Sequence, residues 1–322
     1  MLVYGWQRLG KEMPTRDFCS TIKNRARSRK MKSISRQVML AAVASLAILF
    51  SNRLIWGADE GATATAPPKN TATAPAIHTG TQGRIDKISE RAKQGDVDLL
   101  FVGDSITQGW ETRGKDVWDK YYGNRKAMND GISGDRTQHV LWRHDQGNID
   151  GIHPKLAVIM IGTNNSNGKD NTAEEIADGV TAIVHQLREK LPDTKLLLLG
   201  IFPRGPNTDE QLEAVAKTQL KAAAAKKGAD TIDESEVPAK IAAVKEATKV
   251  QRQKIADANA MISKLADDKM IFYMDIGDKF LQPDGTIPDD VMPDHLHPNA
   301  KGYEIWAAAI EPKVAELMGE KK

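Results

Sequence analysis

Short, uninterrupted apolar runs recur along this chain, and they constrain the fold more than any other feature of the sequence. The runs are "VDLLFV" (97–102), "LAVIMI" (156–161), "KLLLLGI" (195–201) and "MIFYMDI" (270–276), with a weaker one at "KAMND" (126–130). They are bounded by Gly, Pro or Asp and are continuous rather than alternating. Continuous runs of this length are typical of strands that are buried on both faces of a parallel sheet.

Helical patterns separate these runs. The segment 172–190 has an apolar face, opens with the capping pair Thr172 and Glu175, and ends before Pro192. A further helix, "AKGYEIWAAAIEPKVAELM", closes the chain. Five β-α repeats predict an α/β fold with a five-stranded parallel sheet and helices on both of its sides.

Charge is distributed unevenly along the 322 residues. The net charge of the whole chain is +2, but residues 1–58 carry +9 and the remainder carries −7. A body of negative charge has no broad attraction for phosphate backbones, so we expect no nucleic-acid partner.

The basic N-terminal segment has the pattern of a targeting sequence. The basic stretch "MKSISRQ" precedes the apolar run 38–50, and cleavage is expected after Ala58. The apolar run is shorter than the roughly 20 residues that a spanning helix needs. We therefore expect a leader at 1–58 with a signal peptide, a true start at Met31, and a secreted or periplasmic protein. The alternative is an uncleaved N-terminal membrane anchor; no other membrane partner is expected.

Composition divides the rest of the chain. Residues 59–83 are rich in Ala, Thr and Pro, which predicts a flexible linker. The folded domain is then expected at 84–322, with an insertion at 207–252 that reads as two exposed helices joined by an acidic loop. For this insertion a solvated helical hairpin is favoured over a functional lid. The single cysteine, Cys19, lies in the leader, so disulfides and thiolate catalysis are excluded from the domain.

Polar motifs follow four of the predicted strands. They are Gly103-Asp104-Ser105, "GISGD" (131–135), "GTNN" (162–165) and, after a loop, "DHLHPN" (294–299). Because the carboxyl ends of parallel strands share one edge of the sheet, these motifs are expected to lie together.

Together the motifs contain the parts of an acyl-transfer site. Ser105 is a candidate nucleophile, His297 its base, and Asp294 the group that orients the imidazole. The backbone N–H groups of Ser105 and Gly134 and the side-chain amide of Asn164 are candidate oxyanion donors, whose removal costs about 3–4 kcal/mol each.

Each part also has a structural alternative. Ser105 could cap a helix, Gly134 could form only a turn, and Asn164 could be a cap or turn residue. Asp294 and His297, together with His295, could ligate a metal, although no fourth ligand is evident and we predict neither metal nor cofactor. The remaining histidines are interpreted as surface or structural residues: His78, His139, His144, His153 and His185.

The order of these motifs resembles that of the SGNH (GDSL) hydrolase superfamily, named for its Ser, Gly, Asn and His. The matching positions are Ser105, Gly134, Asn164 and His297, the last with Asp294. The resemblance extends over about residues 96–309, apart from the insertion. The segments "NDGISGDRTQHVLWR" and "DHLHPNAKGYEIWA" are most similar to those of bacterial esterases that resemble the platelet-activating factor acetylhydrolase catalytic subunit.

This resemblance implies a flavodoxin-like three-layer α/β/α fold and a metal-independent serine esterase that prefers acetyl groups. The hypothesis that we favour is an exported esterase acting on O-acetylated carbohydrate or a related small acetyl ester. One alternative is a lipid acylhydrolase of the lysophospholipase or acetylhydrolase kind. A second is a non-catalytic binding protein, which would be expected to lack one of the site residues, and none is missing. The sequence does not indicate an oligomeric state.

Overall fold

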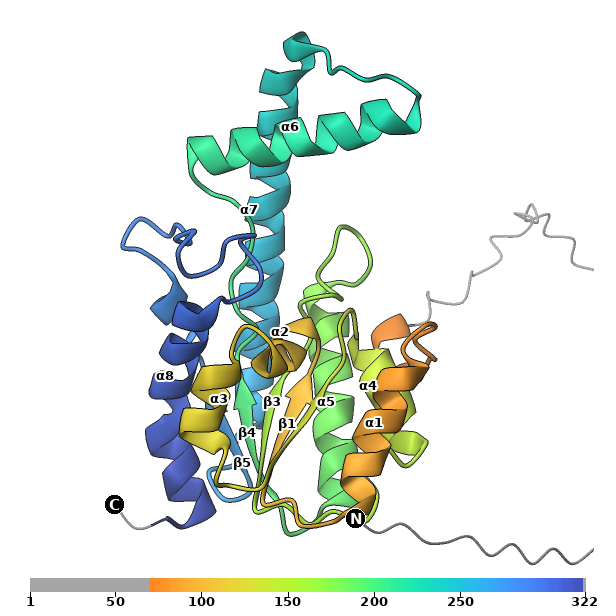
Figure 1. Ribbon diagram of the computed structural model, residues 1–322, viewed down its shortest axis with the longest axis vertical. Helices are drawn as coiled ribbons and strands as arrows, with labels where there is room; N and C mark the ends of the chain where they lie inside the picture. Colours follow the sequence, from red (N-terminus) through yellow and green to blue (C-terminus); the bar gives the residue numbers. More distant parts are fainter. Residues whose placement is uncertain (1–69, 321–322) are drawn as a thin grey trace, which may run out of the picture. The chain divides into compact units, whose positions relative to one another are not determined.

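The computed structural model describes residues 70–320, so the predicted leader at 1–58 and the first part of the predicted linker lie outside the described residues. The five strands form one sheet, in which every neighbouring pair is parallel, in the order β2-β1-β3-β4-β5 (Figure 1). They are β1 (Leu99–Gly103), β2 (Ala127–Gly131), β3 (Leu156–Met160), β4 (Lys195–Leu199) and β5 (Ile271–Met274). The predicted α/β fold with a five-stranded parallel sheet is therefore confirmed.

Helices connect the strands. They are α1 (Gln82–Lys93), α2 (Ser105–Gln108), α3 (Lys115–Tyr122), α4 (Thr137–Asp145), α5 (Ala173–Lys190), α6 (Asp209–Lys226), α7 (Val237–Ile262) and α8 (Ala300–Met318). Short 3₁₀ turns occur at Thr71–Thr73, Gly109–Glu111, Glu234–Glu236, Ser263–Leu265 and Gly277–Phe280. The helix predicted at 172–190 is present as α5, and Thr172 and Glu175 cap it reciprocally.

Each strand contributes side chains to two cores, because successive residues point to opposite faces of the sheet. Leu100 and Val102 of β1 pack with α1, α4 and α5 on one face. Leu99 and Phe101 pack with α3 and α8 on the other face. Figure 1 shows these two helical layers on either side of the sheet. Burial on both faces is the reason that the apolar runs of the sequence are continuous.

The order of the strands creates a topological switch point between β1 and β3. From β1 the chain passes outward to β2, and it then returns to the other side of β1 for β3. Crevices at such points, at the carboxyl ends of the strands, are where open α/β sheets bind ligands. The residues that follow β1, β2 and β3 are therefore placed at the edge most suited to a site.

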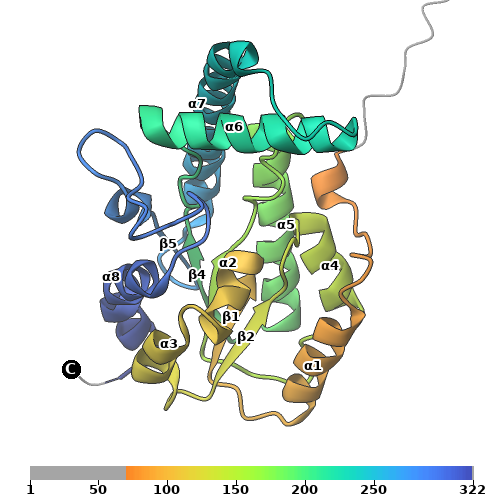
Figure 2. The same ribbon diagram turned by 45° about the horizontal axis from the view of Figure 1, so that its top comes forward.

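The predicted insertion contains two helices, α6 and α7, that stand away from the sheet at its carboxyl edge (Figures 1 and 2). Leu212 and Ala216 of α6 pack against Val244 of α7 in a small separate core. However, α7 continues past the predicted end of the insertion at residue 252. Its last turns carry Ile255 and Ile262, which are buried against the domain. The outer part of α7 thus belongs to the hairpin and the inner part to the domain.

The linker predicted at 59–83 is wrong for its second half. We call residues 70–78 the N-terminal strap, since they pack along the domain before α1 begins. Ala72 is fully buried, and its carbonyl accepts a 2.8 Å hydrogen bond from the Thr137 hydroxyl. The Ala76 N–H donates to the Gln138 carbonyl at 3.1 Å. These short side chains fit closely against α4 and α5, a contact that their composition alone does not reveal.

A helix able to cross a membrane would need to be both long and strongly apolar. None of the helices within residues 70–320 meets both conditions.

Candidate active site

The nucleophile candidate is the first residue of α2. Asp104, directly before it, caps this short helix: its Oδ1 accepts the Ile106 N–H at 2.9 Å. The alternative in which Ser105 itself caps the helix is therefore wrong. Because Asp104 fills that role, the hydroxyl of Ser105 is available for other partners.

Ser105, His297 and Asp294 form one chain of hydrogen bonds. The Ser105 Oγ lies 2.9 Å from His297 Nε2, and His297 Nδ1 lies 2.6 Å from Asp294 Oδ2. The other oxygen of Asp294 accepts the backbone N–H groups of His297 and Leu296, at 2.7 and 3.2 Å. Residues 192 positions apart in the sequence thus meet at the carboxyl edge of the sheet.

The surroundings of Asp294 favour its charged form. Partial burial acts to raise the pKa of Asp294, but the hydrogen bonds from the backbone and side chain of His297 outweigh it and hold the pKa below the usual value. A carboxylate that stays ionised can stabilise a positive charge on His297.

A hydrogen bond joins the loop that carries Gly134 to the loop that carries Asn164. Asn164 Nδ2 donates to the Asp135 carbonyl at 2.8 Å, immediately after Gly134. Gly134 has a φ of +82°, in the left-handed region that glycine adopts readily. A Cβ at this position would also lie only 3.0 Å from the ring of His78. The backbone conformation therefore favours glycine at this position, and a larger residue would also require the His78 ring to shift.

Further hydrogen bonds join these loops to α2. The Ser133 N–H donates to Gln108 Oε1 at 2.7 Å, and Asn129 Nδ2 donates to the Thr107 carbonyl at 2.9 Å. The predicted oxyanion donors therefore lie on loops that are connected to the helix of the nucleophile.

Asp135 is held by buried partners that the sequence analysis did not identify as a group. Its carboxylate accepts Arg143 Nε at 2.9 Å, and His78 Nδ1 lies 2.8 Å from the other oxygen. The ring of His78 stacks on that of His139 at 4.5 Å. Arg143 also pairs with Asp130, and all three charged groups are almost completely buried. Because Asp135 follows Gly134 directly, this cluster fixes the loop of a candidate oxyanion donor.

His78 was interpreted, like His139 and His144, as a surface or structural residue, and its contact with Asp135 was not expected. It lies in the Ala/Thr/Pro-rich stretch, where no motif or periodicity marks it. Of the other two, His144 is buried and His139 is partly buried. His144 lies 2.8 Å from Asp130, and burial lowers the pKa of His139 to about 4.

The alternative metal site at Asp294, His295 and His297 does not form. Within residues 70–320, the group of three possible ligand atoms that all lie within 4.8 Å of one another belongs to His78, Asp135 and His139 instead. In that group the Arg136 N–H already occupies His139 Nδ1 at 3.1 Å. His295 is buried, with its Nδ1 3.6 Å from Asp289.

Arg204 is a second residue that sequence reasoning did not identify. It follows β4, and its Nη1 donates to the Thr163 carbonyl and to Asn167 Oδ1, each at 3.1 Å. Burial lowers the pKa of Arg204, while Asp104 and Asp294 act to raise it. Arg204 therefore places a half-buried positive charge beside the two carboxyl groups of the site.

Comparison with known proteins identifies the family of this chain. The sequence profile of the GDSL-like lipase/acylhydrolase family matches residues 101–240 and 220–305, two ranges that overlap within the α6–α7 region. The rat platelet-activating factor acetylhydrolase IB subunit alpha2 is 31% identical over 71% of this chain and 80% of its own length. The human platelet-activating factor acetylhydrolase IB subunit alpha1 is 27% identical over 71% of this chain and 80% of its own length.

Solved structures show the same fold. A Bacteroides fragilis protein assigned as an acylhydrolase superposes with a TM-score of 0.51 and 18% identity, over 72% of this chain and 96% of its own. On the family match and the similarity to these relatives, the chain belongs to the GDSL-like lipase/acylhydrolase family and is a carboxylic ester hydrolase.

Proposed function

We propose that the protein is an exported serine esterase that removes acetyl groups from O-acetylated carbohydrate. The observation that carries the proposal is the bonded chain from Ser105 through His297 to Asp294. A serine hydroxyl is a poor nucleophile until a base takes its proton, and His297 Nε2 lies within hydrogen-bonding distance of it. Export is supported by the signal-peptide pattern of the leader.

The proposed reaction has two steps. Ser105 Oγ attacks the acyl carbonyl carbon as its proton passes to His297, and the imidazolium then protonates the departing alcohol. Water, deprotonated by His297, attacks the carbonyl carbon of the acyl-enzyme. The bond between this carbon and Ser105 Oγ then breaks, Oγ takes the proton from His297, and the acid leaves as acetate. Asp294 holds the imidazole in one tautomer and stabilises its positive charge.

The negative oxygen of each tetrahedral intermediate requires donors, for which we propose the N–H groups of Ser105 and Gly134 and the amide of Asn164. Within residues 70–320, neither of these backbone N–H groups donates a hydrogen bond. Asn164 Nδ2 uses one hydrogen on the Asp135 carbonyl, which orients the amide and leaves its second hydrogen for the oxyanion. Donors oriented before the reaction stabilise the transition state without reorganisation.

The experiment is hydrolysis of p-nitrophenyl acetate and p-nitrophenyl octanoate by the full chain. We expect faster turnover of the acetate and loss of both activities in Ser105→Ala. Ser235→Ala, on the exposed loop between α6 and α7, serves as the matched control. Turnover of the acetate that persists in Ser105→Ala would contradict the proposal.

A second candidate is acyl hydrolysis of a lipid, favoured by the 31% identity to a platelet-activating factor acetylhydrolase subunit. A preference for octanoate, or for an acetylated ether phospholipid over an acetylated xylo-oligosaccharide, would support this candidate. Against it stands the space between the α6–α7 hairpin and the loop of Asp294, where a lipid chain would cover the polar groups of Arg204, Lys240 and Gln251.

A further inference from the structure

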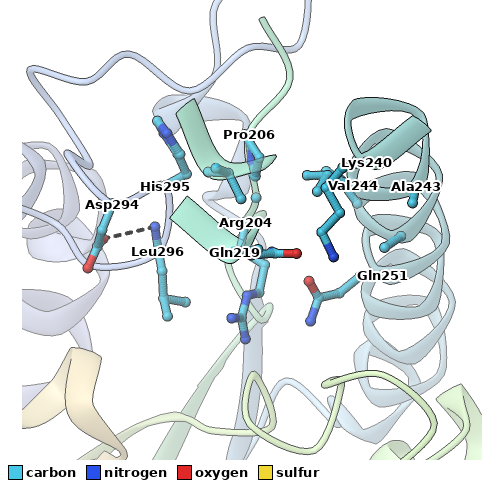
Figure 3. Close-up of a pocket in the computed structure, with 14 residues that line it drawn as sticks. Arg204, Pro206, Gln219, Lys240, Ala243, Val244, Gln251, Asp294, His295 and Leu296 are labelled. Atoms are coloured by element: carbon cyan, nitrogen blue, oxygen red, sulfur yellow. Dashed lines mark hydrogen bonds between the residues drawn. The ribbon is translucent and has the colours of Figure 1, made fainter. Parts of the chain in front are cut away.

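A pocket of about 360 Å³ lies between the α6–α7 hairpin and the loop that carries Asp294. Residues 204–206, which follow β4, and residues 294–296 form one side of the pocket, and α6 and α7 form the other (Figure 3). Asp294 is bonded to His297, so the pocket directly adjoins the proposed triad. Arg204 of the pocket also donates to the Thr163 carbonyl, next to Asn164, so we expect one part of an ester bound at Ser105 to reach this space.

Both apolar and polar side chains line the pocket; Val215, Val244 and Leu296 are among the apolar ones. Figure 3 shows Gln219 of α6 and Lys240 and Gln251 of α7 reaching into it, with Arg204 below them. Burying these groups under a hydrocarbon chain would remove their water without replacing its hydrogen bonds, which is unfavourable. Hydroxyl groups would supply both donors and acceptors to the two amides. A polyhydroxylated alcohol therefore suits the polar part of this lining better than an acyl chain does.

The charge of the pocket is positive. Within the part of the chain that the structure describes, neither Arg204 nor Lys240 has a carboxylate within 4.0 Å, although many other basic residues do. Asp294 is the acidic residue of the lining, and Figure 3 shows its carboxylate turned away from the hairpin. An anionic group on the occupant would pair with these two cations.

From this combination we infer that the pocket binds the alcohol part of the ester and that this alcohol is a sugar bearing a carboxylate. The inference rests on the proposed esterase function and adds the class of its substrate. Lys240 belongs to the α6–α7 hairpin, so the inserted helices determine which acetylated sugar is selected. The departing sugar remains in the pocket while acetate is still bound to Ser105.

The test compares O-acetylated oligogalacturonate, which is acidic, with O-acetylated xylo-oligosaccharide, which is neutral, by measuring released acetate. We expect the full chain to have a higher kcat/KM for the acidic substrate. Lys240→Gln should lower the ratio of the two kcat/KM values about tenfold, since it removes a charge-assisted hydrogen bond. Lys245→Gln is the matched control, because this lysine is exposed on the same helix and lies outside the pocket.

Binding provides a readout that does not need the reaction. In a Ser105→Ala background, titration with unacetylated oligogalacturonate should give a Kd that Lys240→Gln weakens about tenfold and Lys245→Gln does not. The inference would be overturned if Lys240→Gln changed neither the ratio of the two kcat/KM values nor the Kd. A preference of the full chain for the neutral sugar or for an acetylated phospholipid would also overturn it. Failure of the full chain to hydrolyse p-nitrophenyl acetate would instead overturn the proposed function.

Discussion

Asp104 shows how a buried carboxyl group supports the residue beside it. One of its oxygens caps α2, and the other has no hydrogen-bond partner within residues 70–320. Burial raises the pKa of Asp104 to about 7, although the Ile106 N–H acts in the opposite direction. The side chain therefore fixes the backbone of Ser105 at a cost in stability that depends on pH.

The sign of this dependence follows from the two pKa values of Asp104. The unfolded chain releases the proton near pH 3.8, whereas the folded chain holds it until about 7. The free energy of unfolding should therefore fall as the pH rises between these values and stay low above them. Asp104→Asn keeps an oxygen for the Ile106 N–H but cannot ionise. Urea unfolding measures the free energy of unfolding at pH 5 and at pH 8. Between these two pH values it should fall less in Asp104→Asn than in the unsubstituted chain. An equal fall in both would assign the pH dependence to other groups.

Substitution of Asn164 tests whether its side-chain amide takes part in the proposed oxyanion hole. Asn164→Ala should lower kcat by about 100- to 1000-fold with little change in KM, because the oxyanion exists only in the transition state and its intermediates. Steady-state kinetics with p-nitrophenyl acetate measure both constants. Thermal unfolding of the variant controls for loss of the bond to the Asp135 carbonyl. A folded variant with unaltered kcat would remove Asn164 from the site.

Among the elements, the strands were the most predictable from the sequence. Burial on both faces leaves an apolar run that composition reveals directly, and each predicted strand overlaps an observed one. The inner end of α7 was missed, because the Ala- and Lys-rich pattern of the hairpin conceals that Ile255 and Ile262 reach the domain. The N-terminal strap was missed because residues such as Ala72 pack through small side chains and backbone hydrogen bonds.

The strap acts on the site through His78, and this leads to a prediction. His78→Ala removes the bond to the buried carboxylate of Asp135 and should lower the free energy of unfolding by about 1–3 kcal/mol. Because Gly134 and the acceptor of Asn164 lie on the same loop, kcat should also fall while KM changes little. His78→Asn, which can still donate to Asp135, should recover most of both losses. Chemical unfolding and kinetics with p-nitrophenyl acetate check this together, and a fall in stability with unchanged kcat would limit His78 to a structural role.

For the whole molecule, the sequence predicted the parts of the site but not all of their neighbours. Ser105 and Asn164 were identifiable because each lies in a short motif near the end of a strand, and His297 because it lies in the motif at 294–299. Arg204, His78 and the pocket under the hairpin were not, because they depend on segments that are distant in the sequence and lack motifs of their own. These residues come together only when the chain folds, so their grouping at one edge of the sheet cannot be predicted from the sequence.

The central claim is that His297 activates Ser105 as the nucleophile at the carboxyl edge of the sheet. The most direct measurement is mass spectrometry of the full chain after treatment with diisopropyl fluorophosphate, which reacts with activated serines. The account predicts a single adduct on Ser105, lost activity, and very slow labelling in His297→Ala. An active enzyme that is labelled at another residue, or that stays active and unlabelled, would contradict it.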